Sequence, residues 1–351
     1  FQDISSYSSK QAYKKNQKKK KRTGLKVFLS FICVILVLVG GVMIYASTVL
    51  LGDLKTTTIT KDKTELGISE ETKSEAGITN IALFGVDARD YDGGTFAGRS
   101  DAIMVMSIDN VHHKVKLTSI MRDVRVYMGD GSPYDSGYDK LNHAYMYGGP
   151  EQAIRTINQN FGLDIQDYVT VNFSAMAKIV DAFGGVNIDL TEEEVEQINI
   201  NMHDLAATSP DSMAGDVSTY APLSAGEGVL LNGDEAVAYG RIRAIGNDNG
   251  RVERQQEVLS ALLSKASSIS KLEYPSIIQQ LAPLCETSLT FDKMIGLAQI
   301  ALTGFDIERL SIPSDVEGYA SDYCEGGGWM WTYDTDVAAQ HIHEFIYEDE
   351  N

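Results

Sequence analysis

The sequence predicts an α/β fold: a layered α-β-α domain with a central mixed sheet, preceded by one transmembrane helix. Short apolar runs alternate with helix-patterned segments over residues 78–351, which is typical of helices packed on a sheet. One long apolar run precedes this region, and the charge of the chain divides at that run. The alternation predicts the fold class, and the other two observations predict a membrane anchor.

The apolar run at residues 25–51 is long enough to cross a bilayer. Its only charge is Lys26, which leaves 25 uncharged residues, where about 20 are needed. A cleaved signal peptide is the alternative, with Tyr45-Ala46-Ser47 as a weak cleavage site, but signal-peptide apolar regions reach only about 15 residues. Nine of the 30 basic residues and one acid precede residue 27, so residues 1–24 are predicted to be a cytoplasmic basic tail.

The chain beyond residue 26 is acidic, with 21 basic residues against 48 acidic ones and a net charge of −27. Residues 52–77 are rich in Thr, Lys and Glu and are predicted to form an extracytoplasmic stalk, with the folded domain at residues 78–351. An acidic domain repels polyanions, so we expect no nucleic acid partner. For the basic tail, anionic lipid headgroups are the nearer partner.

The elements of the domain follow from local patterns. Residues 79–86 form a short apolar run between turn residues, which is typical of a buried strand. Pro150 suits the start of a helix and Gly162 its end. Further strands are predicted at 103–108 and 114–121, joined as a hairpin, and at 168–172, 185–190 and 307–312. Helices are predicted at 150–161, 174–183, 232–241, 251–270, 274–284, 291–303 and 334–347.

The three cysteines divide between the membrane and the outside. Cys33 lies in the predicted span, which leaves Cys285 and Cys324 in an oxidising compartment. They are predicted either to pair as a disulfide or to be two buried free thiols, and the sequence leaves both alternatives open.

Two groups of charged residues stand out in the acidic domain. Asp87 lies just after one apolar strand and Asp101 just before the next, positions where a carboxylate can hold Mg²⁺ together with phosphate oxygens; the alternative is a solvated loop acid. Arginines gather in the second group, within fourteen residues: Arg241, Arg243, Arg251 and Arg254. Guanidinium groups at a helix start bind phosphate well. Their alternative role is to pair with the many carboxylates.

Six sequence blocks occur in an order that resembles the LytR-CpsA-Psr family of cell-envelope proteins. They cover residues 79–270, and residues 271–351 resemble the looser C-terminal part of the same domain. The blocks read GVDARD, GRSDAIMVMSID, LTSIMRD, YDKLNHAYMYGGPEQAIRTI, YVTVNFSAMAKIVDAFGGVNIDL and LNGDEAVAYGRIRAIGNDNGRVERQQEVLSAL. One departure is Met121, where the family usually has Pro before the Arg-Asp pair.

The resemblance implies roles for matching positions. It implies Asp87 and Asp101 as ligands of the cofactor Mg²⁺. It implies catalytic roles for Arg122, Arg241, Arg243 and Asp248, and pyrophosphate binding by a larger set: Arg99, Arg122, Lys140, Arg241, Arg243, Arg251 and Gln255. The general base is predicted to be Asp248 or Asp123. Residues expected to border a groove for the lipid chain are Val169, Val171, Phe173, Met176, Ile179, Val180 and Phe183, which are otherwise ordinary core.

The implied function is that of a Mg²⁺-dependent phosphotransferase in bacterial cell wall assembly, in an organism of the Gram-positive type. It would move a teichoic acid or capsule-like polysaccharide from a polyprenyl (undecaprenyl) pyrophosphate carrier to peptidoglycan, on the outer face of the cell membrane. The alternatives are a polyprenyl pyrophosphate phosphohydrolase and a non-enzymatic envelope regulator. The sequence leaves open the polymer, the acceptor position and the oligomeric state.

Overall fold

Seven strands form the central sheet of the computed structural model, which describes residues 55–86, 98–208, 222–268, 280, 284–290, 293–294, 305–324 and 328–348. In spatial order the strands are β1 (Lys55–Thr56), β10 (Cys285–Thr287), β7 (Asp167–Asn172), β2 (Ile78–Val86), β3 (Ser100–Asp109), β4 (Lys114–Ile120) and β11 (Asp306–Ile312). The β2–β3 and β3–β4 pairs are antiparallel, whereas β7 and β11 run parallel to their neighbours β2 and β4. The predicted mixed sheet is therefore confirmed.

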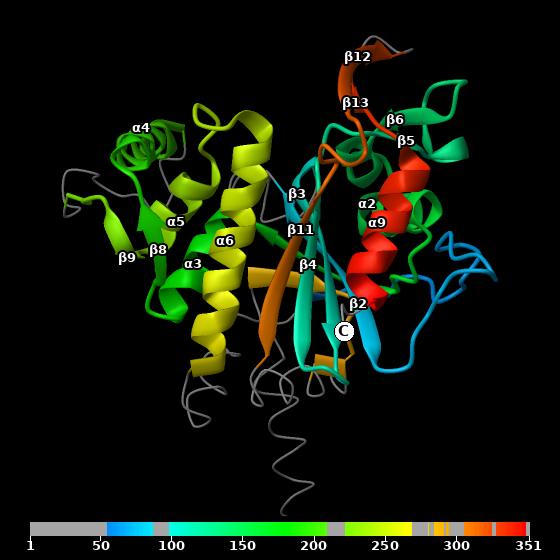
Figure 1. Ribbon diagram of the computed structural model, residues 1–351, viewed down its shortest axis with the longest axis horizontal. Coiled ribbons are helices and arrows are strands. Elements are labelled where there is room, and N and C mark those ends of the chain that lie inside the picture. The colour runs from blue at the N-terminus through cyan, green and yellow to red at the C-terminus, as the bar shows by residue number, and fades with distance from the viewer. Residues whose placement is uncertain are drawn as a thin grey trace, which may run out of the picture. The chain divides into compact units, whose positions relative to one another are not determined.

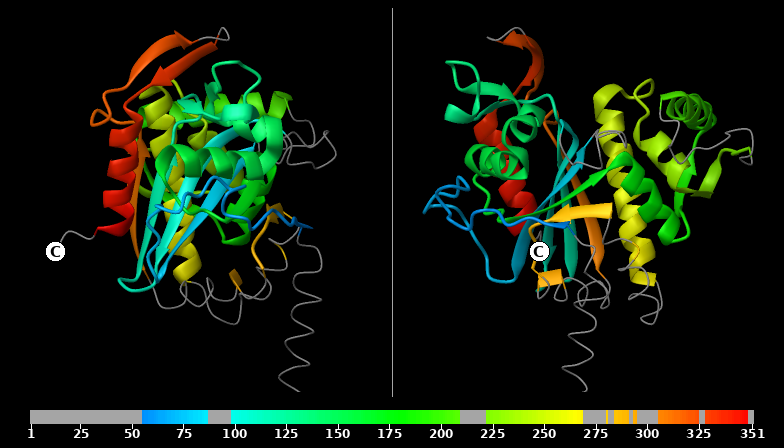
Figure 2. Two further views of the ribbon diagram at one scale, coloured as in Figure 1. Left: turned by 90° about the vertical axis from the view of Figure 1, so that its right-hand side faces the viewer. Right: turned by 180° about the vertical axis from the view of Figure 1, so that it is seen from behind.

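Helices cover both faces of this sheet (Figures 1 and 2). Successive side chains of β2 alternate between two cores: Ala82 and Phe84 face one, while Ile81 and Leu83 face the other. This alternation explains why the strand reads as a continuous apolar run. The first core is closed by α2 (Leu141–Phe161) and α9 (Thr335–Tyr347), and the second by α6 (Asn247–Ser268).

A third cluster of buried residues joins the smaller elements beside α6. Its elements are α3 (Phe173–Ala182), β8 (Val186–Leu190), α4 (Glu192–Thr208), β9 (Gly226–Leu231) and α5 (Gly233–Gly240). The sequence pattern does not predict α4 or β9, because α4 is acidic over its first turn and β9 is mostly exposed, so neither has a clear apolar stripe.

Besides the antiparallel pair of β8 and β9, two further two-stranded sheets lie outside the main sheet. One joins β5 (Arg125–Tyr127) to β6 (Tyr138–Lys140), with a short 3₁₀ turn, η3 (Gly129–Gly131), between them. The other is the hairpin of β12 (Ala320–Cys324) and β13 (Gly328–Thr332), at the top of Figure 1. These strands are too short to show a period of two in the sequence, so the prediction missed them.

The helix expected at residues 150–161 is the second half of a longer element. Helical backbone already begins at Leu141, and the non-helical Gly148 and Gly149 interrupt it before Pro150. Gly149 has φ 64°, a conformation that glycine adopts without steric cost. Gly162 ends the helix in the left-handed conformation, as predicted.

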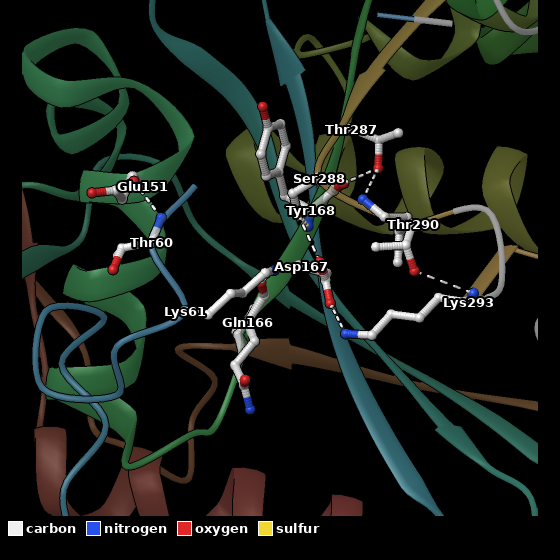
Figure 3. A network of polar contacts seen from close by, with 12 residues as sticks. Thr60, Lys61, Glu151, Gln166, Asp167, Tyr168, Thr287, Ser288, Thr290 and Lys293 are labelled. Atoms are coloured by element: carbon white, nitrogen blue, oxygen red, sulfur yellow. Dashed lines mark hydrogen bonds and ion pairs between the residues drawn. The ribbon is translucent and has the colours of Figure 1, made fainter. Parts of the chain in front are cut away.

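The stalk prediction is wrong for residues 57–77. Ile59, Leu66 and Ile68 are buried in the first core, so this segment is part of the folded domain. Lys61 anchors it through a 2.7 Å ion pair with the buried carboxylate of Asp167, which Lys293 also contacts (Figure 3). The polar composition misled the prediction, because only a few apolar residues of the segment face inward.

Several predictions lie outside the described residues. They are the apolar run at 25–51, the side chain of Asp87, and nearly all of the helices predicted at 274–284 and 291–303. Within the part of the chain that the structure describes, none of the helices combines the length and the apolar character of a membrane span.

Candidate active site

Residues from six regions of the chain, most of them charged, surround one polar cavity of about 380 Å³. Asp101 comes from the start of β3, Arg122 from the segment after β4, and Asn201 from α4. The remaining lining residues are Phe173, Arg241, Arg243, Arg251 and Gln255. Seven of the residues singled out in the sequence therefore line one cavity: four arginines, one carboxylate, the amide of Gln255 and the ring of Phe173.

The arginines after α5 are positioned by the ends of two helices. A capping box of Asn232 and Glu235 fixes the start of α5, and the helix ends at Gly240, so Arg241 is its C-terminal cap. Arg251 lies in the first turns of α6 and is only 3% exposed. The guanidinium groups thus meet where one helix ends and the next begins.

Arg254, the fourth arginine of this segment, has a structural role instead. Its Nε donates to Glu194 Oε1 at 3.0 Å and one of its terminal nitrogens donates to the Ile245 carbonyl at 2.9 Å. The alternative role predicted for these arginines, an ion pair with a carboxylate, is therefore confirmed for Arg254. Among the described side chains, Arg241 and Arg243 form no ion pair of this kind.

An ion network extends from the cavity through Arg122. Its guanidinium donates to Asp101 Oδ1 at 2.5 Å and to Asp123 Oδ2 at 3.0 Å, and Lys140 Nζ lies 3.1 Å from the other Asp123 oxygen. Met121, which replaces the usual proline, donates its backbone N–H to the Ile312 carbonyl at 2.8 Å. Proline lacks that donor, so Met121 gives the segment an anchor of its own.

The same network makes Asp123 a poor general base. Burial by itself would raise the pKa of Asp123, but the charges of Arg122 and Lys140 outweigh burial and hold the pKa below its ordinary value. A carboxylate with a lowered pKa takes up a proton less readily. Asp248, the other predicted base, lies in α6, and its side chain is outside the described residues.

An apolar cavity of about 230 Å³ shares two wall residues, Phe173 and Gln255, with the polar one. The Arg241 guanidinium lies 5.2 Å from the centre of the Phe173 ring, at the boundary between them. Five of the seven residues predicted to border a lipid groove line this cavity: Val169, Val171, Phe173, Met176 and Ile179. Val180 and Phe183 do not; they pack in the neighbouring core.

Two of the predicted pyrophosphate-binding residues lie outside the lining of the polar cavity. Arg99 is exposed just before β3, and Lys140 is held against Asp123. Asn201 lines the cavity but gave no signal in the sequence, because it is one polar residue in a helix that the pattern did not predict. Cys285 is a free thiol in the apolar cavity wall, which decides against its pairing with Cys324.

The polar cavity offers one described acidic ligand for a divalent cation, Asp101. Within the described ranges no three His, Cys, Asp or Glu side chains gather as a metal-binding group. Mg²⁺ is commonly held by one or two carboxylates together with phosphate oxygens, so an acid beside four arginines fits a cation that arrives with a phosphorylated substrate. Asp87, the second predicted ligand, lies outside the described residues.

The LytR_cpsA_psr family model matches residues 42–345, so the chain belongs to this family. It is 26% identical to the polyisoprenyl-teichoic acid–peptidoglycan teichoic acid transferase TagT of Bacillus subtilis over 85% of this chain and 91% of that protein. It is 29% identical to the corresponding transferase TagU of Bacillus mycoides over 88% and 91% of the two chains.

Solved structures share the fold. The crystal structure of B. subtilis TagT matches with a TM-score of 0.60 at 22% identity, over 83% of this chain and 99% of that one. TagT with bound octaprenyl pyrophosphate lipid matches with a TM-score of 0.57 at 21% identity, over 82% and 99% of the two chains.

Proposed function

We propose that this protein transfers a glycopolymer of the teichoic acid or capsule type from a polyprenyl pyrophosphate carrier to peptidoglycan. The observation that carries the proposal is the common wall of the two cavities, where Arg241 lies against Phe173. A polyprenyl pyrophosphate has one strongly anionic part joined to one long apolar part. The polar cavity matches the anionic part, and the apolar cavity next to it matches the lipid chain. The relatives named above are transferases of this kind.

The residues suggest how the reaction is assisted. The apolar cavity would take the first isoprene units, and Arg241, Arg243 and Arg251 would grip the pyrophosphate oxygens. An acceptor sugar hydroxyl attacks the distal phosphorus, the bond to the bridging oxygen breaks, and the lipid phosphate leaves. The fixed guanidinium groups stabilise the charge that develops on the leaving phosphate.

Asp101 and Asp87 are the residues that would hold Mg²⁺. When bound, the ion would help to neutralise phosphate charge. Arg122 donates to Asp101, which orients the carboxylate towards the cavity. Asp248 remains our proposal for the residue that accepts the proton of the acceptor hydroxyl.

The proposed location is the outer face of the cell membrane, with residues 25–51 as a single span and the basic tail in the cytoplasm. This orientation rests on the positive-inside rule and on the uncharged run of 25 residues. It places the donor lipid and the cell wall on the same side as the folded domain.

A reconstituted transfer reaction tests the proposal. Full-length protein receives a synthetic polyprenyl pyrophosphate glycan and peptidoglycan fragments with and without Mg²⁺, and mass spectrometry measures the products. We expect a phosphodiester-linked adduct that needs Mg²⁺ and is lost in Arg241→Ala and Asp101→Ala. Arg309→Ala, an exposed arginine on β11, is the matched control. Release of lipid phosphate without an adduct would identify a hydrolase, and donor binding without turnover would favour a regulator.

A further inference from the structure

The hairpin of β12 and β13 carries an aromatic face next to the ion network of the site. Tyr323 pairs directly with Trp329 across the two strands, and Ser321 pairs with Trp331. Directly opposed residues of an antiparallel pair lie on the same face, and so do residues two apart on one strand. Tyr323, Trp329 and Trp331 therefore share one face, and Met330, on the other face, is 1% exposed.

The aromatic face runs from the core to solvent. Trp331 packs against the first core and its ring lies 4.8 Å from that of Trp329, centre to centre. Trp329 is half-buried, and Tyr323 is 78% exposed at the outer end. A tyrosine exposed to that degree contributes little to the core, so packing does not explain its position.

The hairpin is joined to the site by two contacts. The backbone N–H of Trp331 donates to the Asp123 carbonyl at 2.9 Å. The Lys140 ammonium lies 5.6 Å from the centre of the Trp329 ring and 3.1 Å from Asp123 Oδ1. Asp123 in turn bonds Arg122, which lines the polar cavity. The aromatic face is thus continuous with the place where phosphate chemistry is proposed.

We infer that this face binds the acceptor glycan, a polysaccharide of N-acetylated hexosamines, and directs its hydroxyl towards the phosphorus; the inference rests on the proposed function. The apolar C–H face of a pyranose ring packs well on an electron-rich aromatic face, while the Tyr323 hydroxyl and the Lys140 ammonium bond its oxygens.

The direction of attack favours the acceptor over the donor glycan. In phosphoryl transfer the attacking and leaving oxygens lie roughly in line with the phosphorus. The lipid phosphate leaves towards the apolar cavity, which meets the polar one at Phe173 and Gln255. A chain of contacts connects the polar cavity to the hairpin through Arg122, Asp123, Lys140 and Trp329. None of these four residues lines the apolar cavity. The hairpin therefore reaches the polar cavity through residues that lie outside the lining of the apolar cavity, which suits a surface that delivers the attacking group.

Tryptophan fluorescence tests the inference directly, because the only two tryptophans of the chain are Trp329 and Trp331. Full-length protein in detergent is titrated with a soluble glycan of alternating N-acetylglucosamine and N-acetylmuramic acid. We expect a saturable change in emission, with a Kd that rises at least about tenfold in Tyr323→Ala. Tyr127→Ala, a half-exposed tyrosine on β5, is the matched control and keeps the Kd of the unaltered protein.

The outcomes separate this inference from the proposed function. Unchanged emission, an equal Kd in Tyr323→Ala, or binding only of a glycerol phosphate oligomer of the donor type would overturn the acceptor site. In the transfer reaction, Tyr323→Ala should raise the acceptor KM about tenfold and leave the donor KM unchanged. Glycan binding without any transfer would refute the transferase and keep the site. Transfer with a normal acceptor KM in Tyr323→Ala would keep the transferase and refute the site.

Discussion

The two cavities are built from different parts of the secondary structure. The apolar cavity is lined by side chains from within strands and helices, such as Met104 of β3, Val169 of β7 and Val258 of α6. The polar cavity is lined mainly by residues at or beyond element ends, such as Asp101, Arg122 and Arg241. Within a strand or helix the backbone N–H and C=O groups are hydrogen-bonded to one another, so apolar side chains can pack around them. The ends of several strands and helices meet at the polar cavity, where side chains remain accessible to polar ligands.

This difference predicts how each cavity responds to substitution. Apolar walls recognise a lipid chain by volume, so a change of similar size is tolerated. The arginines recognise anions by position and by the geometry of their donors, and no apolar side chain can replace them. Three experiments test the contrast, in decreasing order of expected effect.

Removal of one guanidinium from the polar cavity should have the largest effect. We expect Arg243→Met to lower kcat/KM for transfer by about 10²–10³-fold, the usual result of losing one fixed donor to a transition-state oxyanion. Arg243→Lys should lower kcat/KM by a smaller factor, because lysine keeps the positive charge. It should still lower it, because lysine lacks the bidentate fork of the guanidinium group. Initial rates at varied donor concentration measure both, with Arg309→Met as control. A rate for Arg243→Met within threefold of the unaltered protein would contradict the assignment.

Filling the apolar cavity should have a moderate effect, confined to the lipid. Met176→Trp adds volume to the wall and should exclude about two CH₂ groups of the chain, at about 0.8 kcal/mol each, which corresponds to a roughly 15-fold higher donor KM. Met176→Leu conserves the volume and serves as control. An equal rise in the KM of a donor with a very short prenyl chain would contradict the assignment of the apolar cavity to the lipid chain.

The Cys285 thiol reports occupancy of the apolar cavity. Burial raises the pKa of Cys285 to about 11, so little thiolate is present at pH 8. In a Cys33→Ser, Cys324→Ser background, we expect the alkylation rate to rise about tenfold per pH unit from pH 7 to pH 10, since thiolate is the reactive form. Polyprenyl pyrophosphate should slow alkylation severalfold, and inorganic pyrophosphate should not. If both ligands slowed the alkylation of Cys285 equally, the apolar cavity would not be a separate binding site for the lipid chain.

The strands and helices that could be predicted are those with a long apolar pattern. Residues 79–86 were predicted as a strand and form most of β2, and the helix predicted at 334–347 is α9 within one residue at its start. The prediction failed where the pattern is short or polar, as in the hairpin of β12 and β13 and in residues 57–77. For these segments the environment is set by what they pack against, which no local period records.

The sequence alone determined that arginines gather near the start of a helix, that carboxylates flank apolar strands, and that the blocks resemble one family. Only the tertiary structure decided which arginine faces a cavity, because Arg251 and Arg254 have the same local chemistry and differ in the helix face they occupy. It also decided that Lys140 meets both Asp123 and Trp329. The reason is physical: apolar periodicity is fixed by neighbours along the chain, whereas the partner of a charge is chosen among dozens of similar groups by the folded geometry.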